Sequence, residues 1–475
     1  MKLEKGKRSE GKEFLKVFPE GFIQRLSTQK YIDSDALLKA LDDPSPVSIR
    51  INKSKWNNRP LKADPVLWCS TGFYLGKRPS FTLDPLFHSG CYYPQEASSM
   101  FLEQALKQTK ASLNNIRVLD LCGAPGGKST LLSDLIGPDS LLVTNEVIRS
   151  RSLILAETIT KWGLGNTLVT QNDPAQFARL PGYFDVILID APCSGEGMFR
   201  NNVAVNEWSV NNTAHCSERQ KRILMNIWPA LKENGILIFS TCTFNPGENE
   251  ENIKWLLRNH EAECLRLNVN DYKGITEIDY QGIYGYGFYP DKVRGEGLFI
   301  SVIRKTGKQN KVHIRSQMKA ELKPEKADFE IADSWTHFKK ERLAKWNGEV
   351  FAVPCDMAEY IHLYQNLKIV KAGIKIFVVK KTDYLPSHEL ALSCHLRREA
   401  FPVEEIDLQK SVSYLRRDFI PMSEALRGWN IVTYKDINLG FIKNIGNRVN
   451  NYFPVEWRIC LGAEALNDVI NIHWE

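Results

Sequence analysis

The chain has 475 residues, enough for about three domains, and 43% of them are apolar, which excludes a largely disordered protein. The net charge of +6 is mild for this length, so it permits a nucleic-acid partner without requiring one. None of the ten cysteines forms a C-x-x-C pair, which argues against a zinc site and a disulfide framework. The sequence contains neither a signal-peptide core nor an apolar run of about eighteen residues. We therefore expect a reduced, cytoplasmic, monomeric protein without a membrane segment or a metal.

Residues 1–90 are expected to form a small N-terminal α/β module. Residues 12–31 and 34–43 show helical patterns, and residues 47–52, VSIRIN, are typical of a strand. The following stretch, 65–100, is aromatic and rich in turn residues, which indicates packing against the next domain.

Residues 91–305 show the alternation of a nucleotide-binding core. Apolar segments typical of strands lie at 118–121, 141–145, 167–170, 185–190 and 235–241, and helical patterns lie at 128–135, 148–162, 218–232 and 248–258. This alternation predicts an α/β fold with a mostly parallel, doubly wound, Rossmann-like sheet. Ligands bind such sheets beyond the carboxyl ends of the strands. We therefore expect one site built from residues at those ends, namely Cys122–Lys128, Glu146, Asn172, Asp173, Asp190–Cys193, Thr241 and Cys242.

The turn Cys122–Lys128 joins the first of these strands to a helix and is rich in glycine. Glycines let the backbone approach a ligand closely, and the N–H groups at a helix N-terminus bind polar or anionic atoms. The turn therefore favours a nucleotide-type cofactor, although a glycine turn taken alone is more often a simple connection.

Three cofactors compete for this turn. A phosphate-binding loop, G-x-x-x-x-G-K-[ST], would need glycine where Cys122 stands, and the dinucleotide pattern G-x-G-x-x-G is also missing. S-adenosylmethionine remains, because an acidic residue at the end of the next strand, Glu146, can bind ribose hydroxyls.

Asp190 and Cys193 in DAPCSGEGMFR, and Cys242 in STCTFNPGENE, are the candidate catalytic residues. A lone cysteine is more often a small buried apolar residue than a nucleophile. Two cysteines and an acid at neighbouring strand ends, beside a cofactor turn, favour covalent catalysis instead. A thiolate that adds to carbon 6 of cytosine, while an acid contacts nitrogen 3, makes carbon 5 able to attack a methyl sulfonium.

The C-terminal part divides into a basic linker, 306–334, and a mixed α+β region, 335–475. The region carries basic clusters interleaved with aromatic residues, namely Arg397, Arg398, Arg416, Arg417, Lys443 and Arg448 with Tyr434, Phe441, Tyr452 and Trp457. This mixture suits RNA phosphates and stacked bases. A solvated surface over an ordinary core is an equally good interpretation of the composition.

Four segments together, CGAPGGKST, TNEV, DAPCSGEGMFR and STCTFNPGENE, resemble those of the Nop2/Sun family of RNA cytosine-5 methyltransferases, over about residues 15–305. The C-terminal extension, with HELALS at 388–393 and GNRVNNYFP at 446–454, is similar to that of the bacterial small-subunit ribosomal type of this family. The resemblance implies an RRM-like fold for the N-terminal module and a PUA-like RNA-binding fold in the C-terminal region. It also implies methylation of a cytosine in RNA, with 16S ribosomal RNA or the small ribosomal subunit as partner. Methylation of tRNA and a non-catalytic role in ribosome assembly are the alternatives.

The same resemblance implies roles for individual residues. Cys242 would be the nucleophile, Cys193 would assist product release, Asp190 would contact the target base and the cofactor, and Lys128 would help to hold the catalytic groups. The methionine part of S-adenosylmethionine would lie on Cys122, Gly123, Ala124, Pro125, Gly126, Gly127 and Lys128, with the ribose on Glu146 and the adenine on Asp173. Spacing alone leaves open which cysteine is the nucleophile.

Overall fold

A ten-stranded mixed sheet forms the centre of the computed structural model, which describes residues 17–309, 322–419, 425–461 and 469–475. Its middle five strands are parallel and follow the order β9-β8-β5-β6-β7. Their bounds are β5 (Arg117–Asp120), β6 (Leu141–Asn145), β7 (Thr167–Thr170), β8 (Phe184–Asp190) and β9 (Leu231–Thr241). The predicted strands and the Rossmann-like core are thus confirmed, and the chain order reverses between β5 and β8.

Antiparallel strands extend this parallel centre on both sides, which the sequence pattern did not predict. Beyond β9 lie β13 (Leu298–Lys305), β12 (Ile283–Phe288) and β11 (Thr276–Tyr280), and β10 (Ala262–Leu265) pairs with β13. On the opposite edge, β16 (Ile369–Ala372) from the C-terminal region pairs with β7. The edge of β7 is therefore covered by chain from beyond the core, which protects its backbone groups from unwanted pairing.

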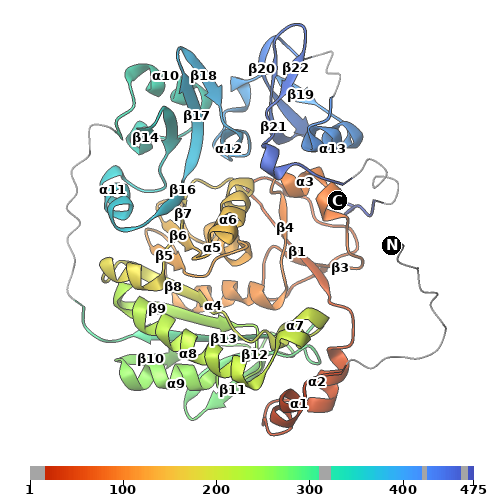
Figure 1. The fold of residues 1–475 in the computed structure, drawn as a ribbon, viewed down its shortest axis with the longest axis vertical. Coiled ribbons are helices and arrows are strands. Elements are labelled where there is room, and N and C mark those ends of the chain that lie inside the picture. Colours follow the sequence, from red (N-terminus) through yellow and green to blue (C-terminus); the bar gives the residue numbers. More distant parts are fainter. Residues whose placement is uncertain (1–16, 310–321, 420–424, 462–468) are drawn as a thin grey trace, which may run out of the picture.

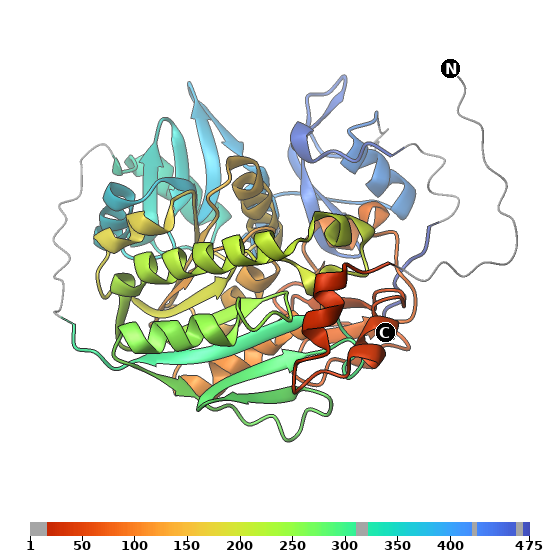
Figure 2. The ribbon, with the colours of Figure 1, turned by 60° about the horizontal axis from the view of Figure 1, so that its bottom comes forward.

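Helices cover both faces of the sheet, because successive residues of the buried strands point to opposite sides. Leu119 and Ile187 pack in one apolar cluster with residues of α8 (Val210–Ile227), α9 (Glu250–Asn259) and α11 (Met357–Asn366). Val118 and Val186 pack in a second cluster with α4 (Leu102–Thr109) and α5 (Gly127–Leu135). Helix α6 (Arg149–Trp162) packs against β7. Figure 2 shows α8 and α9 lying across the sheet.

The helix predicted at 218–232 needs correction. Helix α8 begins earlier, at Val210, where the Ser209 side chain accepts a hydrogen bond from the Asn212 N–H and so caps the first turn. It ends at Ile227, and a 3₁₀ turn that contains Pro229 leads directly into β9. Proline cannot continue an α-helix, so the predicted end was about five residues too late.

The N-terminal module, over its described residues, consists of three short α-helices and a four-stranded sheet of order β2-β3-β1-β4. Its elements are α1 (Glu20–Leu26), α2 (Ser34–Ala40), β1 (Val47–Ile51), β2 (Asp64–Pro65), β3 (Gly72–Leu75), α3 (Pro85–His88) and β4 (Tyr92–Pro94). The first predicted helical pattern begins at residue 12, and its residues 12–16 lie outside the described residues. Helix α1 packs through Phe22 against Phe199 and Trp208 of the core, so the module is joined to the segment that follows Cys193.

The C-terminal region contains two four-stranded sheets that lie beside each other at one end of the core (Figure 1). The first consists of β14 (Leu343–Trp346), β15 (Glu349–Ala352), β17 (Ile374–Lys380) and β18 (Asp383–Pro386), followed by α12 (His388–Ala391). The second consists of β19 (Val403–Glu405), β20 (Gly428–Tyr434), β21 (Ile437–Asn444) and β22 (Val449–Asn451), with α13 (Leu408–Arg416) beside it. Within the described ranges, none of the helices has both the length and the apolar character needed to cross a bilayer.

The predicted linker, 306–334, is only partly a linker. Its residues 310–321 lie outside the described residues, but residues from Lys326 onward form helix α10 (Lys326–Trp335). A capping box between Glu325 and Asp328 starts this helix, and Trp335 packs against Phe377 with ring centroids 5.5 Å apart. Phe329, Ile331, Ala332 and Trp335 of this helix pack in one apolar cluster. They are few among the polar residues of the stretch, which is why composition alone suggested a linker.

Arg50 on β1 joins the N-terminal module to the core. Its side chain is fully buried, and its guanidinium donates to Gln95 Oε1 at 2.9 Å, to Asp134 and to Thr130. It also lies over the ring of Trp162, 4.4 Å from the ring centroid. Burial raises the pKa of Asp134 to about 6, against the opposing effect of Arg50. A buried ion pair of this kind ties the two parts together, because either charge alone would be costly in the interior.

We expect Arg50→Met to lower the free energy of unfolding by about 3–5 kcal/mol, because the Asp134 carboxylate would lose its buried partner. Arg294→Ala is the matched control, since its pair with Asp64 is exposed and should contribute under about 1 kcal/mol. Denaturant unfolding followed by circular dichroism measures both variants. Equal effects of the two substitutions would contradict the role assigned to Arg50.

Candidate active site

The predicted site residues gather at the carboxyl edge of the parallel strands, around the point where the strand order reverses. Two adjoining cavities of about 490 and 280 Å³ lie there and share Cys122, Ala124, Asp190, Met198 and Cys242 in their walls. The larger cavity is also lined by Gly123, Pro125, Gly127 and Lys128, and the smaller one by Glu146, Asp173 and Cys193. Open α/β sheets place their ligands at this position. Of the predicted residues, Gly126, Asn172 and Thr241 line neither cavity.

The turn Cys122–Lys128 depends on its glycines. A Cβ on Gly123 would lie 2.1 Å from Thr144 Oγ1, and Gly126 has a φ of +120°, which side chains rarely adopt. Ser129 ties the helix that follows the turn to the neighbouring strands, because its hydroxyl lies 2.6 Å from Asp120 Oδ2 and 2.7 Å from Thr144 Oγ1. Asp120 is fully buried and its Oδ1 has no hydrogen-bond partner among the described residues; burial raises its pKa to about 7. The turn thus presents bare backbone to the larger cavity.

Glu146 and Asp173 follow β6 and β7 and place two carboxylates on the wall of the smaller cavity. Glu146 Oε1 accepts the Ile148 N–H at 3.0 Å, and Asp173 Oδ1 accepts the Ala175 N–H at 2.9 Å. These contacts fix the orientation of both carboxylates, and each carboxylate can accept further hydrogen bonds from a ligand.

Asp190 at the end of β8 is held between a cation and a hydroxyl. Lys128 Nζ donates to Asp190 Oδ2 at 2.8 Å, and Ser240 Oγ on the neighbouring strand β9 donates to Oδ1 at 2.8 Å. Burial disfavours the charge of Lys128, but Asp190, Asp120 and Cys242 outweigh this effect and raise the pKa of the ammonium group. Lys128 is therefore a fixed positive charge beside the acid and the thiol.

The two cysteines come together in space. Cys193 Sγ and Cys242 Sγ are 3.1 Å apart, and the Cys242 backbone N–H donates to Cys193 Sγ at 3.3 Å. The hydrogen bond with Cys242, together with burial, raises the pKa of the Cys193 thiol well above its usual range. Cys193 is therefore a neutral thiol at pH 7, directly beside a second thiol that opens into both cavities.

Two consecutive residues at the start of α9, Glu248 and Asn249, hold the segments that carry these thiols. Glu248 accepts the N–H of Ser194 at 2.9 Å and its hydroxyl at 2.6 Å, and so fixes the residue after Cys193. Asn249 accepts the Thr241 hydroxyl at 2.6 Å and donates to the Thr243 carbonyl at 3.0 Å, and so fixes both neighbours of Cys242. We call this pair the α9 brace.

Sequence reasoning missed the α9 brace because Glu248 and Asn249, in the motif NPGENE, are not nucleophiles and do not follow a strand end directly. It also missed several polar residues of the two cavities, namely Tyr93, Gln95, Arg200, Arg219, Arg222 and Asn226. Arg219 and Arg222 lie three residues apart and hence on one face of α8, a spacing that could have marked them. Over the ranges that the structure describes, no group of three or more His, Cys, Asp or Glu residues could hold a metal ion.

A Rossmann-like sheet, a glycine turn at its switch point and acidic residues after the next two strands are the features of a nucleotide-cofactor enzyme of the S-adenosylmethionine-dependent methyltransferase class. Comparison with known families agrees with this class. The family model described as 16S rRNA methyltransferase RsmB/F matches residues 107–304. Models of the RsmF N-terminal domain and of the RsmF PUA domain match residues 18–97 and 401–459.

Curated relatives identify the family over almost the whole chain. Ribosomal RNA small subunit methyltransferase F of Salmonella heidelberg is 30% identical over 92% of this chain and 96% of its own. The enzyme of the same name from Klebsiella pneumoniae is 28% identical over 92% of this chain and 96% of its own. The chain therefore belongs to the RsmF family of RNA methyltransferases.

Solved structures show the same fold over about three fifths of this chain. A methyltransferase homolog protein from Pyrococcus horikoshii is 28% identical with a TM-score of 0.52, covering 61% of this chain and 95% of that one. NSun6 from Pyrococcus horikoshii, solved with the S-adenosylmethionine analogue SFG, has a TM-score of 0.51 at 18% identity and covers 62% of this chain and 100% of that one.

We expect Asn249→Ala to lower the methylation rate by about tenfold or more, because the Cys242 segment would lose both of its anchors and small displacements of reacting groups are costly. The affinity for S-adenosylmethionine, measured by calorimetry, should stay within about twofold of the wild type. Asn259→Ala, at the exposed end of the same helix, is the matched control and should behave like the wild type. A fully active Asn249→Ala variant would show that the α9 brace does not position the thiols.

Proposed function

We propose that this protein transfers a methyl group from S-adenosylmethionine to carbon 5 of a cytosine in 16S ribosomal RNA. The observation that carries the proposal is the 3.1 Å approach of the Cys193 and Cys242 thiols, beside Asp190 and at the wall of the cofactor cavity. The relatives that match over 92% of this chain are named as small-subunit ribosomal RNA methyltransferases, which supports the choice of RNA. A pure RNA-binding protein would need no such pair of thiols.

The residues at the strand ends fit S-adenosylmethionine, which supplies an electrophilic methyl group when bound. The exposed backbone of Cys122–Lys128 would hold the methionine part, next to the buried Asp120 oxygen that has no partner among the described residues. Glu146 would accept the ribose hydroxyls, and Asp173 would accept the amino group of the adenine, since both carboxylates line one cavity.

Cys242 is assigned as the nucleophile. Its thiolate adds to carbon 6 of the cytosine, and the electron pair of the double bond moves so that carbon 5 becomes nucleophilic. Ring nitrogen 3 gains electron density in this step and takes up a proton, which Asp190 would pass to it and recover from the Lys128 ammonium that donates to its Oδ2. The ammonium of Lys128 donates to Asp190, and both residues line the larger cavity together with Cys242.

Cys193 is assigned to the release of the product. After methyl transfer, a Cys193 thiolate would take the proton from carbon 5. The double bond between carbons 5 and 6 would then re-form, the Cys242 thiolate would leave, and ring nitrogen 3 would return its proton to Asp190. Cys193 lies against Cys242 and so can take part as a base only in its deprotonated form. Because its pKa is raised, this form becomes abundant only at alkaline pH.

The target cytosine must leave its stack to reach these residues, which favours single-stranded or looped RNA. The C-terminal region supports this kind of substrate, because residues 401–459 match the PUA domain of the family. The N-terminal module adds a second surface, since α1 packs against the segment that follows Cys193.

Bisulfite sequencing of 16S ribosomal RNA treated with the purified protein and S-adenosylmethionine tests the proposal directly. We expect one cytosine to become protected with the wild type and none with Cys242→Ala, because this variant lacks the thiol assigned as the nucleophile. Cys216→Ala on α8 lies outside both cavities and should leave the protection unchanged. Unprotected RNA with the wild-type protein would refute the proposed function.

We expect Cys193→Ala to accumulate a covalent protein–RNA adduct, because addition through Cys242 would proceed and release would be slow. In the wild type, the adduct should break down faster as the pH rises toward and above 9, since the pKa of Cys193 lies above that value. In Cys193→Ala this acceleration should be absent. Denaturing gel electrophoresis after mixing with labelled RNA measures both effects, and an adduct seen with Cys242→Ala but not with Cys193→Ala would reverse the two roles.

A further inference from the structure

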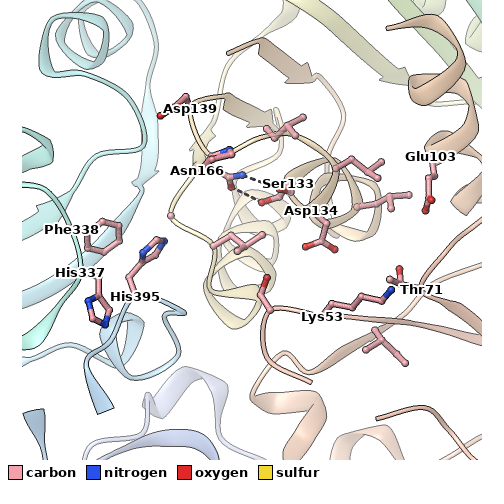
Figure 3. A pocket seen from close by; sticks show the side chains of 18 of the residues that line it. Lys53, Thr71, Glu103, Ser133, Asp134, Asp139, Asn166, His337, Phe338 and His395 are labelled. Carbon is pink, nitrogen blue, oxygen red and sulfur yellow. Dashed lines mark hydrogen bonds between the residues drawn. The ribbon is translucent and has the colours of Figure 1, made fainter. Parts of the chain in front are cut away.

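A third cavity, of about 710 Å³, lies near the amino ends of the parallel strands, whereas the active site lies at their carboxyl ends. Its walls come from three parts of the molecule (Figure 3): Lys53 and Thr71 of the N-terminal module, Asn166 just before β7, and His337 and His395 of the C-terminal region. Ligand sites occur preferentially at such junctions and typically have volumes of about 300–1,000 Å³. The proposed chemistry of the strand ends makes no use of this cavity.

The acidic residues of this junction cavity are all engaged by neighbours. Glu103 accepts the Ser70 N–H and the ammonium of Lys107, and Asp134 is bound by Arg50 and by the indole N–H of Trp162. Asp139 lies 3.8 Å from the guanidinium of Arg342. The carboxylates therefore add little negative potential to the cavity.

The basic side chains of the cavity, in contrast, are largely unengaged. Lys53, Lys339 and His337 line it, and none of these side chains has a hydrogen-bond or ion-pair partner within the described ranges. They come from two different parts of the chain and face the same space. Two unpaired lysines, Lys53 and Lys339, that line one cavity favour a ligand that carries a phosphate.

An aromatic pair lies beside these cations. The rings of Phe338 and His395 are 4.3 Å apart at 32°, and both side chains are only partly buried. Burial, together with the neighbouring His337 and Arg342, lowers the pKa of His395, so its ring is neutral at pH 7. Figure 3 shows Phe338, His337 and His395 together on one wall of the cavity. Flat rings next to lysines are the combination that binds single-stranded RNA through base stacking and backbone charge.

We propose that the junction cavity binds a nucleotide of single-stranded RNA, with its base against Phe338 and His395 and its phosphate near Lys53 and Lys339. This inference rests on the proposed function only in that the bound strand belongs to the RNA substrate. The cavity lies at the other ends of the parallel strands from Cys242, so the target cytosine cannot occupy it. It instead holds a nucleotide that flanks the target in the RNA. Because three parts of the protein form its walls, this contact requires all three parts to be folded together.

A fluorescent oligouridylate is the probe for this site, and its affinity is measured by anisotropy at several salt concentrations. We expect the double variant Lys53→Glu and Lys339→Glu to weaken binding and to reduce the slope of log affinity against log salt by about one to two. Phe338→Leu, which keeps an apolar side chain without a flat ring, should weaken binding by about fivefold or more. Lys326→Glu is the matched control, because this lysine is 94% exposed on α10 and does not line the cavity.

Thermal unfolding and calorimetry with S-adenosylmethionine accompany each variant and should be unchanged for the lysine variants. A 4-thiouridine oligonucleotide, crosslinked to the wild type and mapped by mass spectrometry, should label the peptide that contains Phe338 or His395. Unchanged affinity and salt slope in the variants, crosslinks confined to other surfaces, or binding of uridine monophosphate but not of the oligonucleotide would each overturn the proposal. If the wild-type protein does not methylate RNA, the proposed enzyme function fails. The binding proposal is still tested, because the anisotropy measurement does not depend on turnover.

Discussion

The adjacency of β8 and β9 at the centre of the sheet is the constraint on which the site depends. Because these strands are parallel and pair in register, Asp190 lies beside Ser240 and the segments that follow both strands leave the sheet together. Each segment then brings one cysteine back to the same point, 3.1 Å from the other. The acid, the cation and the two thiols thus share a single edge with the glycine turn after β5.

Parallel pairing fixes the positions of the ends of β8 and β9. The segments that follow these strands need further hydrogen bonds to hold them in place. The α9 brace supplies these bonds from one side through Ser194, Thr241 and Thr243. From the other side, the buried carboxylate of Glu196 accepts the Trp208 indole N–H at 2.9 Å and the Phe244 N–H at 3.1 Å, and it lies 2.7 Å from Arg25 of α1. The N-terminal module therefore contributes to the rigidity of the catalytic segments.

The sequence allowed the sheet core and the position of the site to be predicted, because apolar strand segments are short, buried and sharply bounded by glycine, proline or polar residues. Cys122, Glu146, Asp190 and Cys242 could be placed on one edge from strand ends alone, and the structure brings them together there. Other features depend on contacts between distant residues and leave no local pattern. Strand β16 is assigned to the core sheet only by its partner β7, and α10 lies in a stretch whose composition is that of a linker. The α9 brace and the junction cavity are likewise visible only once the chain is folded.

The choice between the two cysteines is the central claim, since spacing cannot decide it and their proximity is symmetric. Mass spectrometry of the protein–RNA adduct isolated from Cys193→Ala, after nuclease and protease digestion, tests this claim at the level of a single residue. The account predicts a methylated cytidine attached to the peptide that contains Cys242. A cytidine attached to any other residue, or recovered only on Cys193 in the wild-type protein, would contradict it.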